Sequence, residues 1–170
     1  MPVVRDFRNY RFDYKRIDRC GKFVGRLAYW KLYAIENLLR IFMHSALSVQ
    51  ISPNWWDLAV DPDIRKRAVR VRQNYTRTPW HTVPGKHDIY CVFLPDLNNI
   101  IRANSNLLLP VVPDIDTWIV KIEEVRLPRN LVGHMNFPSQ PDRQKIDEIY
   151  RDVPYLIDCL RVHGMPVEIP

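Results

Sequence analysis

One short stretch of the chain contains the residue types that RNA cleavage needs. Arg129, Asn130 and His134 lie at the end of the segment Glu124–His134. To cleave RNA, the 2′-hydroxyl attacks the adjacent phosphate while the 5′-oxygen departs, and a histidine, which titrates near neutral pH, can move those protons. A forked arginine can hold the phosphate oxygens as charge builds on them, and Asn130 can add a hydrogen bond. These residues are therefore candidate catalytic residues, and no cofactor is expected.

A structural interpretation of the same residues stays open. An arginine followed by a histidine a few residues later is common, although an asparagine directly after the arginine makes the pattern rarer. Arg129 can be a solvated surface residue, and His134 can be a helix-terminal histidine that the helix dipole stabilises.

Three further residues are candidates for substrate binding: Arg126, Glu36 and Arg40. Arg126 precedes Arg129 by three residues and lies on nearly the same side of a helix, where it can contact a second phosphate. In the first helix, a polar stripe has spacings of four, three and four, and consists of Tyr33, Asn37, Arg40 and His44. This stripe either faces the Arg129 segment and completes a site, or is an ordinary surface with a Glu36–Arg40 ion pair.

A long first helix is predicted from about Asp13 to Leu47, because apolar residues recur there at helical spacing. Gly21 and Gly25 weaken its first part and predict a late start or a bend. The expected inward seam is Cys20, Phe23, Leu27, Trp30, Ala34, Leu38, Ile41 and Ser45, thickened by Leu39, Phe42 and Ala46.

A short amphipathic helix with a basic outer face should follow the turn at Ser52–Asn54. Asp61 is placed to be its N-cap and Pro62 its first residue. Its basic residues, Arg65, Lys66, Arg67, Arg70 and Arg72, can guide an RNA backbone or simply form a solvated face. Trp55 and Trp56, just before it, favour burial over stacking on bases.

The rest of the chain predicts helices separated by prolines. Residues 76–86 are turn-like, and residues 88–94 fit either a strand or a buried lead-in to a helix that begins near Pro95. A Pro-rich connection at Pro110 and Pro113 precedes a helix from Asp114 or Asp116, which should kink at Pro128 and resume to about Met135. The last helical stretch follows residues 139–142, is interrupted by Pro154 and closes at Gly164.

These elements predict an all-α fold: a compact bundle of four to five helices with an irregular, Pro-rich middle segment. The 46% hydrophobic content is sufficient for a core, and 14 Pro against 5 Gly argue against a flexible linker between two domains. We therefore expect residues 1–170 to form a single domain with its core at about residues 13–162.

Charge and cysteine content favour an intracellular protein with an acidic partner. The net charge of +6 suits a polyanion such as RNA or DNA first and an anionic membrane surface second, although a basic protein without such a partner is an equal alternative. Three widely spaced cysteines suit buried thiols. The N-terminus lacks the apolar run of a signal peptide and no stretch resembles a membrane span, so a cytoplasmic location is expected. His81 and His87 flank a turn without a matching cysteine or acidic cluster, so a metal site is not expected there.

The pattern Arg-Asn-x-x-x-His at Arg129, Asn130 and His134 resembles the signature of the HEPN superfamily, whose members are small helical bundles. The resemblance implies a metal-independent endoribonuclease, typically of toxin–antitoxin or antiviral systems. It also implies a composite site in which the motifs of two domains face each other. Because this chain has one such motif, a homodimer would be needed.

The resemblance extends loosely over residues 13–162. Tyr29–Leu47 and the following Trp55-Trp56 look like the opening helix and aromatic turn of one HEPN branch, and Tyr90–Ile101 looks like its middle segment. That branch accompanies a PIN nuclease in a eukaryotic RNA-surveillance protein and occurs in many prokaryotic proteins. RNA is then the expected substrate, with an antitoxin or regulatory protein as a further candidate partner. The alternative is a non-catalytic HEPN module that binds RNA, a nucleotide or a protein.

Overall fold

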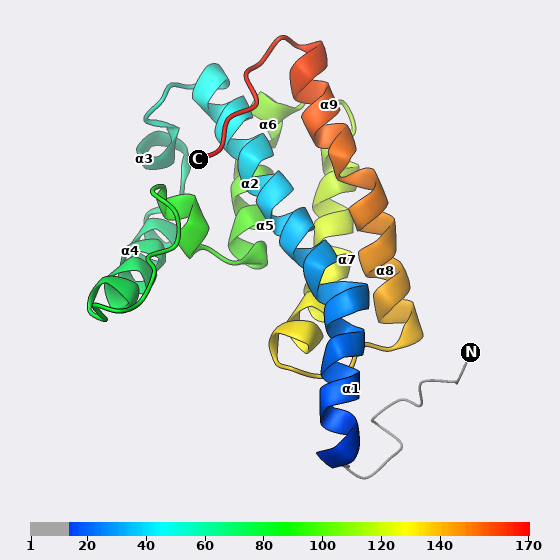
Figure 1. Ribbon diagram of the computed structural model, residues 1–170. Coiled ribbons are helices and arrows are strands. Elements are labelled where there is room, and N and C mark those ends of the chain that lie inside the picture. The colour runs from blue at the N-terminus through cyan, green and yellow to red at the C-terminus, as the bar shows by residue number, and fades with distance from the viewer. Residues whose placement is uncertain (1–13) are drawn as a thin grey trace.

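The computed structural model describes residues 14–170, which fold into a compact arrangement of helices (Figure 1). No strand occurs among these residues, so the all-α prediction is confirmed. The helices are more numerous than the predicted four to five, because turns and prolines divide several of the expected elements. Asp13 lies outside the described residues, as does the N-terminal segment on which the expectation of no signal peptide depends.

The first helix runs without a break as α1 (Tyr14–Val24), the π-helical turn η2 (Gly25–Tyr29) and α2 (Trp30–Gln50). The irregularity predicted from the glycines is therefore the π-turn that begins at Gly25. A π-turn contains more residues than an α-turn and shifts the side chains that follow it. The first part of the predicted seam is therefore shifted by about one position: Trp30 is 44% exposed, whereas Leu32 and Ile35 are buried. Its later part is confirmed, because the predicted residues Leu39, Phe42, Ser45 and Ala46 are buried.

The tryptophan turn and the basic helix form α3 (Trp55–Ala59) and α4 (Pro62–Thr76). Trp55 and Trp56 are buried, as predicted. Asp61 caps α4 by accepting hydrogen bonds from the backbone N–H groups of Asp63 and Ile64, which confirms the predicted start.

Ion pairs occupy most of the basic face of α4. Arg65 pairs with Asp57, Arg67 with Asp96 and Arg72 with Asp88, while Lys66 pairs with Asp63 within the helix. Three of these pairs bind α4 to neighbouring segments of the same chain. The face therefore serves the fold, and most of it is not a free track for a nucleic-acid backbone.

The segment that fitted either a strand or a helix lead-in is a lead-in. It forms the 3-10 turn η3 (Asp88–Cys91), followed by α5 (Leu94–Ala103) with Pro95 in its first turn, and by α6 (Ser105–Leu108). Ile89 and Cys91 are buried, so the apolar residues of the segment 88–94 contribute to the core although they form no strand.

Three further helices complete the bundle: α7 (Ile115–Gly133), α8 (Gln140–Asp152) and α9 (Pro154–Val162). α7 packs against α5 and α8, and α2 packs against α8 and α9 (Figure 1). Ser139 and Asp142 cap α8 reciprocally, and Pro154 separates α8 from α9 as predicted. No helix in the described part of the chain is long and apolar enough to cross a bilayer.

The end of α7 is close to the predicted one, near Met135. The helix continues through Pro128 and ends at Gly133, with His134 as its C-cap. Met135 adopts a left-handed backbone with φ 59°, and the N–H groups of Met135 and Asn136 donate to the carbonyls of Val132 and Leu131. This is the helix end that glycine normally provides.

Replacing Met135 by glycine should raise the free energy of unfolding by about 1 kcal/mol, because a side chain in the left-handed region is strained. Gly164 occupies the equivalent position after α9, with φ 63°, and a methyl group added there would meet no atom within 4 Å. Gly164→Ala should therefore lower the free energy of unfolding by a similar amount, through backbone strain alone. Urea titrations of both variants measure these changes, and a Met135→Gly protein no more stable than the wild type would show that position 135 is unstrained.

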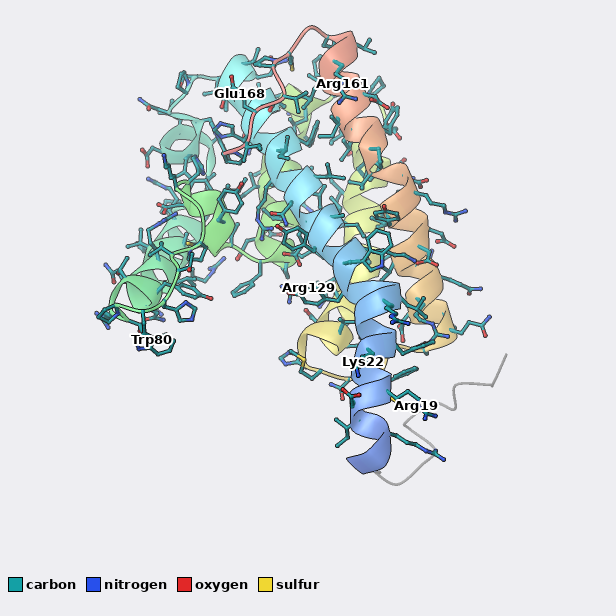
Figure 2. All side chains as sticks on the ribbon, viewed as in Figure 1. Arg19, Lys22, Trp80, Arg129, Arg161 and Glu168 are labelled. Atoms are coloured by element: carbon teal, nitrogen blue, oxygen red, sulfur yellow. The ribbon has the colours of Figure 1, made fainter. Side chains whose placement is uncertain are left out.

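Two half-buried histidines lie in an aromatic cluster between α2, α3 and η3. Trp55 Nε1 donates to Nδ1 of His44 (3.3 Å), and the backbone N–H of Ile89 donates to Nδ1 of His87 (3.1 Å). The two imidazole centres are 5.2 Å apart. Glu168, in the C-terminal segment beside the end of α2 (Figure 2), lies 3.8 Å from His44 Nε2.

Stability should fall as the pH drops below 6.5. Burial lowers the pKa of His44, and Glu168 opposes this shift. The pKa of His87 is also lowered, mainly by burial and to a smaller extent by the nearby His44. Below the ordinary value of 6.5 the unfolded chain therefore binds more protons than the folded one, and unfolding is favoured. Denaturation at a series of pH values measures how steeply the free energy of unfolding changes with pH. This dependence should be weaker in a His44→Gln, His87→Gln double variant. An equal slope in that variant would assign the effect to other groups.

Candidate functional site

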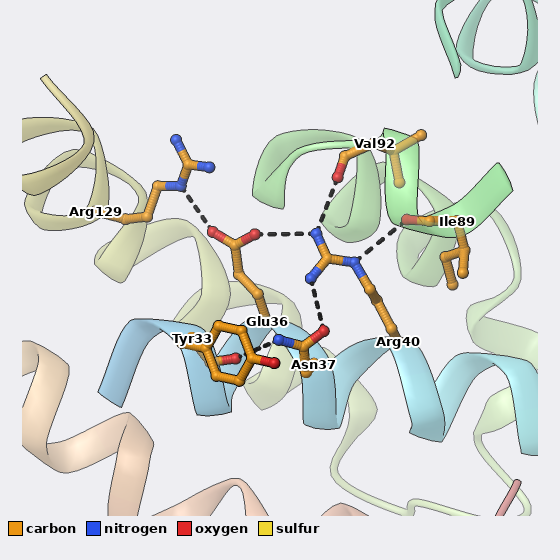
Figure 3. A network of polar contacts seen from close by, with 7 residues as sticks. All are labelled: Tyr33, Glu36, Asn37, Arg40, Ile89, Val92 and Arg129. Atoms are coloured by element: carbon orange, nitrogen blue, oxygen red, sulfur yellow. Dashed lines mark hydrogen bonds and ion pairs between the residues drawn. The ribbon is translucent and has the colours of Figure 1, made fainter. Parts of the chain in front are cut away.

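A buried carboxylate joins the end of α7 to the first half of α2. Arg129 Nε lies 2.7 Å from one oxygen of Glu36, and Arg40 Nη2 lies 3.1 Å from the other oxygen (Figure 3). The Glu36 side chain is only 13% exposed. One carboxylate therefore holds two guanidinium groups, one from each helix.

The protein itself uses the donors of Arg40. Its Nη1 donates to the side-chain oxygen of Asn37, its Nε to the carbonyl of Ile89 and its Nη2 to the carbonyl of Val92, besides the bond to Glu36 (Figure 3). Arg40 is buried, and these bonds fasten α2 to the segment between η3 and α5. Arg40 therefore forms part of the wall of the site and is held there by bonds within the chain.

Arg129 has donors to spare. Its only hydrogen bond to the described residues is the one from Nε to Glu36, so Nη1 and Nη2 have no acceptor there. Figure 3 shows both nitrogens directed away from the Glu36 carboxylate. The guanidinium also lies 5.7 Å from the ring centre of Phe93, which supports it from the side. Glu36 and Phe93 thus fix the guanidinium while its forked end stays open.

An open pocket of about 430 Å³ lies at this network. We call it the Arg129 pocket, and its lining residues are Tyr29, Leu32, Tyr33, Glu36, Asn37, Arg40, Gly85, Tyr90, Arg129, Val132 and Gly133. Its charged side chains are one carboxylate and two guanidiniums, so the lining carries a net positive charge. A pocket of this size and charge suits a small anionic ligand.

The remaining predicted site residues do not line this pocket. His134 is the exposed C-cap of α7, and Asn130 is half-buried one helical turn before it. Neither side chain forms a hydrogen bond within residues 14–170. Arg126 forms a surface ion pair with Glu123 (2.6 Å). Of the six candidate residues, the fold therefore brings together Arg129, Glu36 and Arg40.

Several lining residues were not predicted as part of the site, among them Gly85 and Tyr90. A methyl group on Gly85 would lie 2.1 Å from the Tyr90 ring, so glycine is needed for the loop to pass over this tyrosine. Arg40 lies 5.9 Å from the centre of the same ring. No sequence pattern links Gly85 to the helix that carries Arg40, because their proximity depends on the path of the whole 76–86 loop.

Comparison with protein-family models, curated proteins and solved structures gives no match to this chain. Within the described residues, no group of histidine, cysteine and acidic side chains is arranged to hold a metal ion. The chemistry of the site must therefore be inferred from its own residues.

Proposed function

We propose that this chain is a metal-independent endoribonuclease of the HEPN type that acts as a homodimer. The observation that carries the proposal is the guanidinium of Arg129, which is fixed through Nε and open at Nη1 and Nη2 in a positively charged pocket. A forked, pre-oriented donor of this kind suits a phosphate whose charge increases during the reaction. The sequence resemblance to HEPN proteins supports the choice of RNA as the substrate.

In the proposed reaction, each catalytic pair is formed across the two copies of the chain, so that a dimer holds two equivalent pairs. Arg129 of one copy binds the non-bridging oxygens of the scissile phosphate, and His134 of the other copy takes the proton of the 2′-hydroxyl. The 2′-oxygen forms a bond to phosphorus, the bond from phosphorus to the 5′-oxygen breaks, and that oxygen takes a proton from water. Asn130 donates a hydrogen bond that positions the phosphate. The exposure of His134 at the end of α7, outside its own chain's Arg129 pocket, supports this sharing.

A chain with this activity would serve as a toxin or antiviral effector in the cytoplasm, with an antitoxin or regulatory protein as its partner. Such a partner would bind near the open Arg129 pocket, because covering it would prevent access of RNA.

Purified protein should cleave RNA in the presence of EDTA and leave 2′,3′-cyclic phosphate and 5′-hydroxyl ends. Electrophoresis of a labelled RNA measures cleavage, and mass spectrometry of the products identifies the ends. Cleavage that appears only after Mg²⁺ is added, or products with 5′-phosphate ends, would contradict the proposal.

The second candidate is a non-catalytic HEPN module that binds RNA, a nucleotide or a protein. It is favoured by the fact that Arg129 alone of the three motif residues lines the pocket. Such a module would bind RNA without turnover, and its affinity would fall as salt increases. Binding without any cleavage product, by protein shown to be dimeric, would select this alternative.

A further inference from the structure

Two exposed tyrosines border the Arg129 pocket. Tyr29 is the last residue of η2 and Tyr33 lies one turn into α2, and their side chains are 61% and 67% exposed. Both belong to the pocket lining, on the same helix as Glu36. Aromatic side chains of this size are usually covered by other apolar groups, so two neighbouring exposed rings at a charged pocket indicate a surface for a ligand.

Within residues 14–170, neither tyrosine has a partner that explains its position. In the described part of the chain, neither ring is stacked on another ring or lies against a cation, and neither hydroxyl forms a hydrogen bond. The backbone carbonyl of Tyr33 accepts from Asn37, but its phenol is unbound. By contrast, Tyr90 is held in the same pocket by Arg40 and lies under Gly85. The pocket thus has one fixed aromatic wall and two free rings.

We propose that the Arg129 pocket is a subsite for one nucleotide, in which Arg129 binds the phosphate and Tyr29 and Tyr33 stack on the base. A base has a flat π-face that stacks on tyrosine, while the phosphate supplies the negative charge that the free Nη groups require. The amide of Asn37 is already engaged by Arg40 and the Tyr33 carbonyl, so the subsite has few free groups with which to distinguish one base from another. It should accept several bases.

The placing of this subsite beside a scissile phosphate rests on the proposed function, but binding of a nucleotide does not require cleavage. Isothermal titration calorimetry with adenosine 5′-monophosphate and with inorganic phosphate separates the contribution of the phosphate, bound by Arg129, from that of the base, stacked on the tyrosines. The monophosphate should bind more tightly than phosphate, and Tyr33→Ala or Tyr29→Ala should weaken it by roughly tenfold while leaving phosphate binding unchanged. Arg129→Ala should abolish both.

Two control variants sharpen this test. Tyr33→Phe keeps the ring and should bind the nucleotide like the wild type. Trp80→Ala removes another exposed aromatic ring, 84% exposed at the far end of α4 and well away from Arg129 (Figure 2), and should change nothing. Thermal unfolding of each variant verifies that the fold is retained, as expected for such exposed positions.

The possible results distinguish the subsite from the nuclease. The subsite is overturned if the nucleotide binds no more tightly than phosphate. It is also overturned if a tyrosine substitution weakens the binding of phosphate as much as the binding of the nucleotide. Tyrosine-dependent nucleotide binding by a protein that does not cleave RNA upholds the subsite and removes the nuclease. If both tyrosine variants cleave RNA like the wild type, and the protein does not bind the nucleotide more tightly than phosphate, the subsite is removed and the nuclease proposal stands.

Discussion

RNA cleavage in EDTA should fall by roughly 10²- to 10³-fold when Arg129 is replaced by alanine, because the open guanidinium that stabilises the charged phosphate is lost. The fold should survive, since Glu36 keeps its bond to Arg40 and the Arg129 side chain is 24% exposed. His134→Ala should cause a loss of about 10²- to 10⁴-fold, the usual contribution of a general base. Initial rates on a labelled RNA measure both losses.

Arg126→Ala provides the matched control on the same helix. Arg126 is also an arginine of α7, but its ion pair with Glu123 lies on the surface and outside the Arg129 pocket. Its removal should lower cleavage far less than removal of Arg129. Equal losses at the two positions would indicate a general effect of positive charge, and full activity in Arg129→Ala or His134→Ala would remove the proposed mechanism.

Replacing Arg40 by leucine should lower the free energy of unfolding by roughly 3–5 kcal/mol, the range for breaking a buried ion pair. Arg40 is 8% exposed, and its loss would leave Glu36 with Arg129 alone and would remove the donors to the carbonyls of Ile89 and Val92. Those carbonyls would stay buried without their present partner. Urea denaturation followed by circular dichroism measures the change.

Arg65→Leu is the corresponding control for an exposed pair. The Asp57 partner of Arg65 is 74% exposed, so this change should alter stability by less than about 1 kcal/mol. If Arg40→Leu were as mild as Arg65→Leu, then Arg40 would not fasten α2 to the η3 segment, and the wall of the Arg129 pocket would have another cause.

Local signals in the sequence predicted the helix boundaries well. Asp61 and Pro62 start α4, Pro95 lies in the first turn of α5, and Pro154 separates α8 from α9. These predictions succeed because capping and proline effects act over one turn and need no knowledge of distant contacts.

Features that depend on the phase or path of the chain were missed. The π-turn η2 shifts the buried face in the first part of α2 relative to the expected seam, and the left-handed backbone of Met135 was not predicted. Arg65, Arg67 and Arg72 looked like a free basic face because their acidic partners lie in other elements, namely α3, α5 and η3. Spacing within one helix cannot reveal such partners.

The candidate site was predicted in part. The sequence indicated that Glu36 and Arg40 could meet the Arg129 segment, and the ion pairs to Glu36 bring all three together. The sequence did not separate the open guanidinium of Arg129 from that of Arg40, which donates four hydrogen bonds within the chain, because that difference depends on the carbonyls of Ile89 and Val92. The exposed Tyr29 and the Gly85–Tyr90 contact also follow from tertiary packing.

A mixture of two inactive variants tests most directly whether Arg129 and His134 act together across two copies of the chain. Arg129→Ala and His134→Ala proteins would be unfolded together, refolded at equal concentration and assayed for RNA cleavage in EDTA. About half of the dimers would then be mixed, each with one intact Arg129–His134 pair, so about a quarter of wild-type activity should return. No recovery, in a preparation shown to contain mixed dimers, would contradict a site shared between two copies.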